Sequence, residues 1–292
     1  MLTDLNKKHF FEKFHKMAMR PIEFDDHLNP IFCHYTRTDF LSFNDEIGQI
    51  SKESVNLSLD FAYKMAVGKF HRETRSGGTE KRTPMKIFLD AASGKLGEFA
   101  VKNFLINYGD GWTFSEPDIS VYKRGVWDKG DGIISKEGSS ISLNVAIKSI
   151  KHFSNLMLLE TKDWKTDLNG AFYIPSSKDI EPEYPDLVIL VKIKETPRSI
   201  FEYSGEIERE NPTQKDLELL KSKTYKYDVC GAITNEELAF LIDNKYIVLR
   251  GSVLVSKKMP TFDAENFYAQ DKDMDPLIPL LKKIENSSCI SV

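Results

Sequence analysis

The amino-acid sequence predicts one α/β domain, in which a mixed central sheet is flanked by helices and follows a mainly helical N-terminal region. Three observations support this prediction. Residues 45–70 carry apolar side chains at the helical period, residues 119–193 contain short apolar or alternating runs between turn residues, and helix-like and strand-like segments alternate after them. A helix, a group of strands and then alternating elements is the order expected for a mixed sheet with helices on both faces.

The length of the chain suits one elaborated domain. A chain of 292 residues is short for two full domains, so we expect residues 1–292 to form a single unit. Within it the patterns indicate a mainly helical N-terminal region at 1–90, an α/β core at 91–250 and a C-terminal extension at 251–292.

Composition narrows the class of protein. The chain is 41% hydrophobic and 29% charged, which is ordinary for a globular protein. No apolar run approaches the ~20 residues needed to span a bilayer, and the first residues lack the apolar stretch of a signal peptide. The three scattered cysteines form no CxxC pair. We therefore expect a cytoplasmic protein with no disulfide framework and no membrane partner.

One basic segment contrasts with the negative net charge of the whole chain. The formal net charge of −4 argues against non-specific binding of nucleic acid through overall charge alone. Residues 69–86, however, hold six lysines and arginines against two glutamates, with Gly77-Gly78 in the middle. Such a loop suits phosphate contact, because guanidinium groups match phosphate oxygens, and it equally suits a solvated surface. The candidate DNA contacts are Arg72, Arg75, Lys81 and Arg82.

The N-terminal region contains two patterns at helical spacing. Three phenylalanines between residues 10 and 14 follow this spacing, until Pro21 and Pro30 break it. From residue 45 to residue 70, one apolar stripe repeats at a period of about 3.6 residues. Its members, which we expect to pack in the core, are Val55, Leu59, Ala62, Ala66 and Phe70.

The middle of the chain supplies a helix and most of the strands. Residues 95–107 are expected to form a helix that carries Glu98 and ends at Gly109-Asp110-Gly111. Residues 187–191 are unbroken apolar, as expected for a central strand covered on both faces. The predicted strands are Ile119–Tyr122, Gly132–Ser135, Ile141–Lys148 and Leu187–Ile193.

The last third alternates between helix and strand. Thr234 and Glu237 have the spacing of a capping box at the start of a helix. The expected elements, in order, are a helix at 212–220, a strand at 225–233, a helix through Ile242 and, after weak strands, a short helix at 277–284.

Two polar residues lie among the apolar strands at a spacing that suits phosphodiester hydrolysis. Asp131 opens a short strand, and Lys148 lies on the next strand 17 residues later, about one hairpin away. If the strands pair, both side chains reach the same edge of the sheet. A carboxylate can hold Mg²⁺, which neutralises charge on a phosphate. A nearby lysine can polarise the attacking water or stabilise the pentavalent state.

This order of residues resembles the PD-(D/E)xK nuclease superfamily, whose best-known members are type II restriction endonucleases. The resemblance is carried by Gly97-Glu98 on a helix, Asp131-Gly-Ile-Ile before a strand and Ile147-Lys148-Ser149 at a strand end, over about residues 94–162. It implies a restriction-endonuclease-like fold with a catalytic core at 91–250. It further implies Mg²⁺ as cofactor, double-stranded DNA as substrate and a homodimer that matches a palindromic site.

The resemblance also assigns roles to individual residues. Asp131 and Glu160 are expected to bind the metal. Lys148 is expected to orient water or stabilise the phosphate, and Glu98 to act as an outer-shell or second-metal ligand. The DNA contacts expected from the lysine's own strand are Ser149 and Lys151.

The sequence departs from the superfamily pattern at two positions. Gly130 stands where the pattern has proline, and Ala146, which has no ligand atom, stands where it has an acid. Some restriction enzymes recruit a glutamate a little more than a dozen residues after the lysine, and Glu160 lies 12 residues after Lys148. Alternatively, Glu160-Thr-Lys162 is itself the E-x-K element, or Ala146 marks an engineered or decayed site. Of these alternatives we expect the first, in which Glu160 supplies the acid that is missing at position 146.

Each candidate also has an ordinary structural interpretation. A helix glutamate usually faces solvent, an aspartate between glycines usually makes a turn, and a glutamate after a strand can begin a loop. Pro185-Asp186 also looks like a PD motif, but no acid lies two residues before the lysines that follow it. We therefore interpret Asp186 as a cap at the start of an inner strand.

Two other functions remain open at this point. Ala146 is also consistent with a DNA-binding protein whose nuclease fold is inactive. A repair or junction-resolving nuclease would use the same residues on branched or damaged DNA. Zinc-dependent and nucleotide-hydrolysing enzymes are disfavoured, because the histidines lack zinc-type spacing and no GxxxxGK[ST] loop is present.

Overall fold

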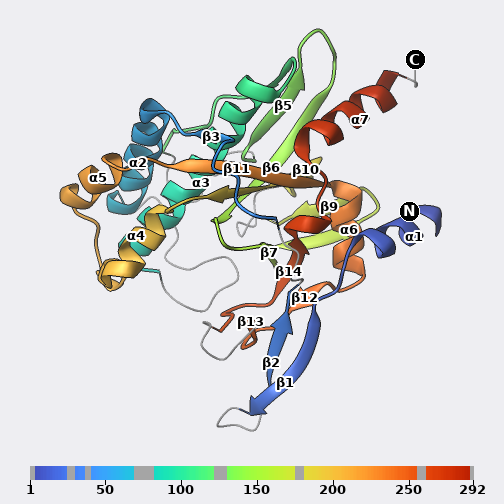
Figure 1. Ribbon diagram of the computed structural model, residues 1–292, viewed down its shortest axis with the longest axis horizontal. Helices are drawn as coiled ribbons and strands as arrows, with labels where there is room; N and C mark the ends of the chain where they lie inside the picture. Colours follow the sequence, from blue (N-terminus) through green and yellow to red (C-terminus); the bar gives the residue numbers. More distant parts are fainter. Residues whose placement is uncertain are drawn as a thin grey trace.

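The fold is mixed α/β, as predicted, with a six-stranded sheet at its centre (Figure 1). The computed structural model describes residues 4–24, 30–36, 41–68, 82–121, 130–174, 181–254 and 261–289. The strand order in the central sheet is β3-β11-β10-β6-β5-β4. None of the described helices combines the length and the apolar character needed to cross a membrane.

Strands β6 and β10 form the parallel pair in the middle of this sheet, and all other neighbours are antiparallel. Strand β10 is buried at all seven residues, which matches its unbroken apolar run. Strand β6 lies between β5 and β10, so both of its edges are hydrogen-bonded. The bounds are β3 Gly48–Gln49, β4 Trp112–Phe114, β5 Gly132–Lys136, β6 Ser142–Lys151, β10 Leu187–Ile193 and β11 Lys226–Thr234.

Helices α2 and α3 cover one face of the sheet and bury the larger apolar cluster against it. Helix α3 begins earlier than expected, because Thr83 caps its N-terminus and Pro84 occupies its first turn. The predicted loop at 69–86 is therefore helical from residue 84, and residues 69–81 lie outside the described residues. The helices on this side are α2 Lys52–Val67, α3 Pro84–Tyr108, α4 Pro197–Ser204 and α5 Gln214–Lys221, with a short turn η1 at Glu206–Glu208.

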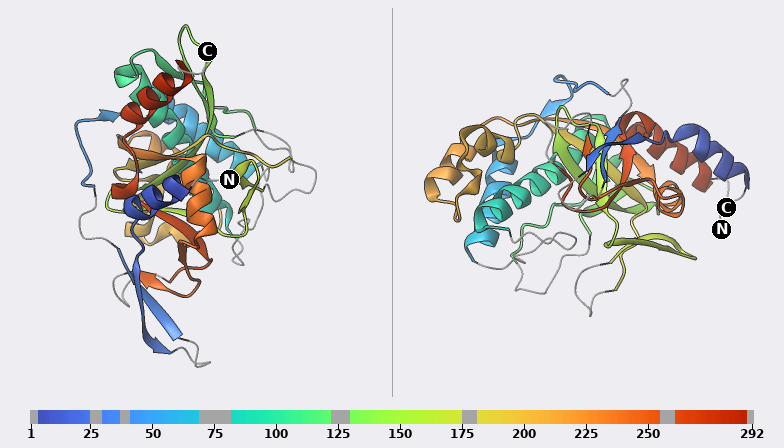
Figure 2. Two further views of the ribbon diagram at one scale, coloured as in Figure 1. Left: turned by 90° about the vertical axis from the view of Figure 1, so that its right-hand side faces the viewer. Right: turned by 90° about the horizontal axis from the view of Figure 1, so that it is seen from below.

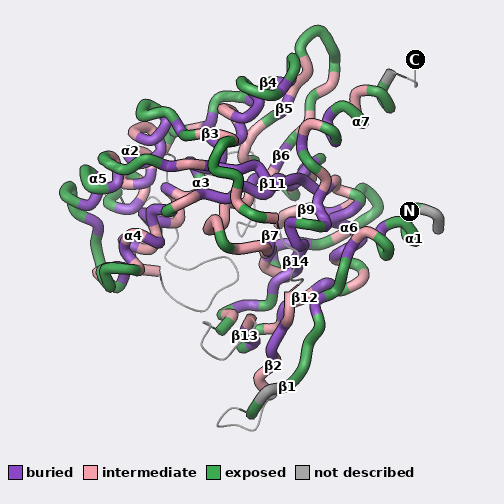
Figure 3. The backbone as a smooth tube through the Cα atoms, in the orientation of Figure 1, coloured by how far each residue is buried: buried purple, intermediate pink, exposed green. Residues whose placement is uncertain are grey.

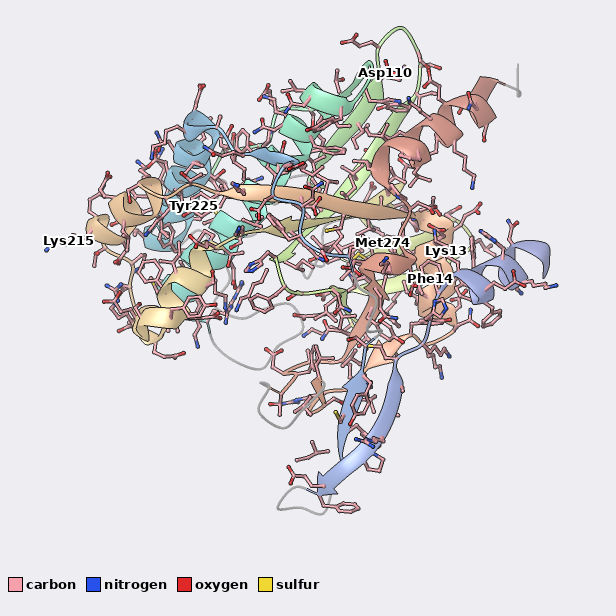
Figure 4. All side chains as sticks on the ribbon, viewed as in Figure 1. Lys13, Phe14, Asp110, Lys215, Tyr225 and Met274 are labelled. Carbon is pink, nitrogen blue, oxygen red and sulfur yellow. The ribbon has the colours of Figure 1, made fainter. Side chains whose placement is uncertain are left out.

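The opposite face is covered by α6 and by a second sheet in the order β12-β14-β7, which share a separate apolar cluster. Helix α6 starts with the predicted capping box of Thr234 and Glu237. Lys13 and Phe14, labelled in Figure 4, attach α1 to α6, because Lys13 Nζ lies 2.5 Å from Glu237 Oε1. The bounds are α1 Asp4–Lys13, β7 Leu156–Glu160, β8 Trp164–Asp167, β9 Gly170–Tyr173, α6 Asn235–Asp243, β12 Ile247–Val248 and β14 Asn266–Gln270.

The N-terminal region is less helical than predicted. Strands β1 (Ala18–Phe24) and β2 (Pro30–Tyr35) form an antiparallel hairpin that projects from the body (Figures 1 and 2). The helix already ends at Lys13, so Pro21 lies within β1 and Pro30 begins β2, and neither proline ends the helix as the sequence indicated. Strand β13 (Val253–Leu254) pairs in parallel with β2. A partner more than 200 residues away along the chain thus completes this small sheet.

The C-terminal segment is part of the core and not an extension. All five residues of β14 are buried between β12 and β7. Helix α7 (Leu277–Cys289) packs Leu277, Leu280 and Leu281 into the same cluster as α3. Figure 3 shows the buried backbone running through β14 as well as through β10 and β11. The predicted boundary at residue 251 therefore does not separate a structural unit.

One predicted strand is absent. Residues 119–121 have no regular structure, and Tyr122 lies outside the described residues. The backbone N–H of Ser120 donates a hydrogen bond to Asp118 Oδ1 at 2.8 Å, so a local side-chain turn replaces the extended conformation.

Candidate functional site

Asp131 lies where the chain enters β5. Gly130 before it has φ of +69°, a conformation that glycine adopts readily and that proline cannot, which accounts for glycine at this position. The backbone N–H of Ile147 on β6 donates a hydrogen bond of 2.6 Å to Asp131 Oδ2. Asp131 makes no other hydrogen bond or ion pair with the described part of the chain. Its carboxylate is therefore fixed by one oxygen, while Oδ1 remains available.

The pairing of β5 with β6 puts Asp131 and Lys148 on one face of the sheet. Gly132 pairs with Val145, so Asp131 lies opposite Ala146. Lys148 follows Ala146 by two residues and therefore points to the same face. Diagonal neighbours across an antiparallel ladder are about 7–8 Å apart, within reach of a long side chain. The predicted hairpin pairing is confirmed.

The Lys148 ammonium is half-buried and has no carboxylate partner within the described ranges. Its Nζ lies 5.9 Å from the centroid of the Trp164 ring, at cation–π distance. Trp164 begins β8 and is itself buried. A partly desolvated cation that contacts only an aromatic ring favours an anion as its further partner.

The same face is open to solvent beside Asp131. Ile133, two residues further along β5, is 41% exposed, whereas Ile134 on the opposite face is fully buried. Because side chains two residues apart share a face, a ligand can reach Asp131 from the side on which Ile133 is exposed.

Glu160 ends β7, which packs over the face of the central sheet that carries Lys148. In its own sheet Glu160 pairs with Asn266 of β14. Trp164, which contacts Lys148, follows Glu160 by only four residues, so this segment lies on the lysine's side of the sheet. Lys162 is exposed in the turn after β7, so only Glu160 of the alternative Glu160-Thr-Lys162 element lies on a strand.

Helix α3 packs directly on β6 through Gly97, on the face opposite Lys148. A Cβ atom added at Gly97 would lie 2.0 Å from Ser149 Oγ and 3.4 Å from Ile147 Cγ2. Ser149 therefore faces the helix, and its Oγ is buried without a hydrogen-bond partner. The expected DNA contact from Ser149 is not possible in this arrangement, because strand alternation turns its hydroxyl away from Lys148.

Glu98 is buried beside this contact and is already paired. Its Oε2 accepts a hydrogen bond of 2.8 Å from Lys95 Nζ, and both side chains are 6% exposed. Lys95 Nζ also lies 5.2 Å from the centroid of the Phe61 ring on α2. Glu98 is thus neither solvent-facing nor on the face of Lys148. The expected convergence of Glu98 with the other acids is not seen, because α3 covers the other face of the sheet.

The three predicted metal ligands do not form one cluster. Among the described residues, no three Asp, Glu, His or Cys side chains are grouped closely enough to hold a metal ion. Mg²⁺, however, usually keeps several waters and takes only one or two carboxylates together with substrate phosphates. Asp131 Oδ1 is an available hard oxygen of the kind that this ion prefers. The residues present fit a metal completed by water and substrate, and not a closed protein cage.

Where the structure describes them, the basic residues that were predicted to contact DNA form ion pairs with acidic residues. Arg82 Nη1 lies 3.4 Å from Asp90 Oδ2 on α3. Lys151, at the end of β6, pairs with Glu202 on α4. The remaining candidates, Arg72, Arg75 and Lys81, lie outside the described residues.

Arg198 on α4 joins these two pairs into one charge network. Its Nη1 lies 3.1 Å from Asp90 Oδ1 and its Nε 2.9 Å from Glu202 Oε1. Burial alone would raise the pKa of Glu202, but hydrogen bonds from Lys151 and Arg198 outweigh it and lower that pKa. Sequence analysis missed Arg198, since a single arginine after Thr196-Pro197 forms no motif and its partners are distant in the chain.

Comparisons of the chain with protein-family models, curated proteins and solved structures found no match. What the protein does must therefore be inferred from the arrangement of Asp131 and Lys148 and from the surfaces around them.

Proposed function

We propose that this protein is a Mg²⁺-dependent nuclease that hydrolyses double-stranded DNA at a specific site, in the manner of type II restriction endonucleases, and acts as a homodimer. One observation carries the proposal. Asp131 and Lys148 lie on one face of the β5–β6 pair, the first with an available carboxylate oxygen and the second without an acid partner in the described structure. A hard metal ligand beside an uncommitted cation is the minimum needed to bind and activate a phosphodiester.

The surroundings of each residue support a distinct role. The Ile147 N–H holds the Asp131 carboxylate in one orientation, so that Oδ1 is positioned for a metal. The Trp164 ring restrains the Lys148 ammonium, which neutralises charge on a phosphate oxygen or orients the attacking water. When bound, Mg²⁺ supplies Lewis acidity to the phosphate. We assign Glu160 as the second carboxylate, because its strand covers the same face, and we assign Glu98 a structural role in its buried pair.

Cleavage of DNA by matched variants tests this proposal. We expect Asp131→Asn and Lys148→Met each to lower the cleavage rate in Mg²⁺ by about a hundredfold or more, the effect of removing one charge-stabilising group. Asp186→Asn is the matched control. Asp186 also precedes a strand of the central sheet, and its Oδ2 also accepts a backbone N–H from β6, that of Asn144 at 2.7 Å. This variant should cleave like the unaltered protein.

Digestion of a mixed DNA substrate followed by sequencing of the ends supplies the measurement. A homodimer at a palindromic site should give paired cuts in both strands at one sequence. Equal cleavage by all three variants would refute the assigned site, and unpaired nicks at unrelated sequences would refute the site-specific dimer. Preference for branched over intact duplex would instead indicate a repair or junction nuclease.

A second candidate is a sequence-specific DNA-binding protein with an inactive nuclease fold. It is favoured by Ala146 opposite Asp131 and by the lack of a three-carboxylate group in the described residues. It predicts retention of one DNA sequence from a random pool with no cleavage in Mg²⁺ or Mn²⁺. Cleavage in either metal would exclude it.

A further inference from the structure

Three aromatic rings lie in a row at the end of β6. The ring centroids of Phe43 and His152 are 5.9 Å apart with an interplanar angle of 76°, and those of His152 and Phe153 are 5.2 Å apart at 81°. Phe153 is 56% exposed, in the turn that follows β6. We call Phe43, His152 and Phe153 the aromatic platform. Large apolar rings at an exposed turn are costly to hydrate and are typical of a contact surface.

A lysine stands at each end of the platform. Lys151 Nζ lies 5.9 Å from the Phe153 ring centroid, and Lys194 Nζ lies 5.9 Å from that of Phe43. Both lysines also pair with acids, Lys151 with Glu202 and Lys194 with Asp45. Because these carboxylates offset the attraction for phosphate, the ring faces are the larger source of binding energy at this surface.

The turn that carries His152 and Phe153 is anchored by backbone hydrogen bonds. The N–H of His152 donates to Ile193 O on β10 at 3.2 Å, and the N–H of Ser154 donates to Lys151 O at 2.9 Å. Asn155 O accepts a bond of 2.9 Å from the N–H of Asp271. A surface fixed in this way loses little conformational entropy when a ligand binds.

We propose that the aromatic platform binds unpaired bases of single-stranded or locally opened DNA by stacking. Every base has a π-face, so stacking on aromatic side chains is tolerant of sequence and suits unpaired nucleotides. Bases inside an intact duplex are already stacked on one another and cannot cover these rings. The platform therefore distinguishes opened from closed DNA.

The position of the platform relates it to the proposed cleavage site, and this step rests on the proposed function. Lys151 follows Lys148 by three residues on one strand, a separation of about 10 Å. That length corresponds to about three base steps of a DNA strand. Because side chains alternate along β6, Lys151 points to the face opposite Lys148, toward α4. A DNA strand whose phosphate contacts Lys148 therefore reaches the platform by passing the end of β6, a path of at least about three base steps. Within the proposed cleavage of duplex DNA, the platform takes a base that has left the helix near the cleaved bond.

Binding of labelled oligonucleotides tests the platform independently of cleavage. Fluorescence anisotropy is measured with the Asp131→Asn protein, using an oligothymidylate of about 20 nucleotides, an abasic strand of equal length and a blunt duplex. Phe153→Ala is compared with Phe11→Ala, whose ring on α1 is similarly exposed at 54%. Phe153→Trp tests rescue by another aromatic ring, and circular dichroism confirms that each variant is folded.

We expect Phe153→Ala to weaken binding of oligothymidylate about tenfold, in line with the loss of one stacked base. Phe11→Ala and Phe153→Trp should bind like the parent, and the abasic strand should bind weakly to all four proteins. Equal affinities of Phe153→Ala and Phe11→Ala for oligothymidylate would overturn the proposal, as would preference for oligouridylate over oligothymidylate. If the parent binds but the unaltered protein never cleaves, only the proposed nuclease activity fails.

Discussion

At the scale of single residues, Ala146 is the position on which the chemistry of the site depends. It lies opposite Asp131 and two residues before Lys148, so a side chain there points between them. An acid at this position would complete the pattern expected from the superfamily resemblance. With alanine there, the second carboxylate of the proposed site would come from β7, where Glu160 ends the strand over the same face.

Moving the carboxylate from position 160 to position 146 tests this account at the scale of single residues. Glu160→Gln should lower DNA cleavage by about a hundredfold, because a neutral amide is a poorer Mg²⁺ ligand than a carboxylate. Adding Ala146→Glu to that variant should restore part of the rate, which is measured under single-turnover conditions with supercoiled plasmid. Ala146→Gln, with the same size and no charge, serves as control and should restore nothing.

Three results of this exchange have different meanings. Full activity of Glu160→Gln would show that Glu160 is no ligand. Cleavage by Ala146→Glu alone, in a protein otherwise unable to cut, would identify a decayed site. Equal recovery with glutamate and glutamine would show that volume, and not charge, is restored at position 146.

At the scale of elements, the contact between α3 and β6 sets the relation of the helix to the site. Gly97 lets α3 approach Ser149 and Ile147 more closely than any other residue would. The same contact determines which face of β6 is covered by a helix, and so leaves Lys148 on the other face. The buried pair of Lys95 and Glu98 lies next to it and joins α3 to α2.

Substitution of Gly97 tests this packing. Gly97→Ala should lower the free energy of unfolding by about 1–3 kcal/mol, the usual cost of overpacking a core. Ser149→Ala removes the nearest atom, Ser149 Oγ, so the double variant should recover at least half of the loss. Gly94→Ala on the same helix is the control. Apart from its own helix backbone, no atom of the described residues lies within 4 Å of its added Cβ, and helix propensity should make this variant neutral or stabilising by up to about 1 kcal/mol.

Urea denaturation of the four variants and the unaltered protein measures these free energies. Additive effects of Gly97→Ala and Ser149→Ala would mean that the two residues do not crowd each other. A loss of stability in Gly94→Ala as large as in Gly97→Ala would mean that alanine is poorly tolerated along the whole helix.

At the scale of the whole molecule, buried charges tie segments from both ends of the chain to the central sheet. Lys192 of β10 and Asp271 after β14 are fully buried, with 2.7 Å between Nζ and Oδ2. Lys192 Nζ also donates to Leu41 O at 2.6 Å. Asp228 of β11, buried nearby, accepts a bond of 2.9 Å from the Asn44 N–H. The segment after β2 is therefore held by the sheet and by the C-terminal part of the chain.

The pH dependence of stability reports on this arrangement. Burial raises the pKa of Asp228, and Asp271 adds to the effect. Between the ordinary pKa and this raised value the folded carboxyl keeps a proton that the unfolded chain releases. Stability of the unaltered protein is therefore lost as pH rises through this window. Asp228→Asn cannot ionise, so its melting temperature relative to the unaltered protein should increase with pH.

Asp45 serves as the control, because the pKa of its carboxyl is shifted in the direction opposite to that of Asp228. Its hydrogen bond with Lys194 lowers the pKa of this exposed carboxyl, so its contribution is present above the ordinary pKa and is lost in acid. Asp45→Asn should therefore melt progressively lower than the unaltered protein as pH rises. Thermal unfolding followed by circular dichroism from about pH 2 to about pH 8 covers both windows, that of Asp45 below its ordinary pKa and that of Asp228 above it. Identical pH trends in the two variants would contradict this account.

Features that depend on local sequence were predicted well. The apolar run of β10, the capping box of α6 and the glycine stop after α3 follow from short-range preferences and were confirmed. The pairing of the strands of Asp131 and Lys148 also followed from sequence, because one hairpin separates them and side chains alternate along a strand. The metal, the substrate and the catalytic roles stay predictions.

Contacts between distant segments were decided only by the tertiary structure. Lys95 and Glu98 are neighbours on α3, but their pair is buried only because α2 packs over it, and Ser149 faces α3 because Gly97 admits it. Helical spacing gave no sign of the N-terminal hairpin, whose third strand, β13, comes from near residue 253. The platform likewise joins Phe43 to a turn more than 100 residues later. Sequence patterns record the periodicity of each element, whereas the energy of these contacts arises only when elements far apart in the chain are packed together.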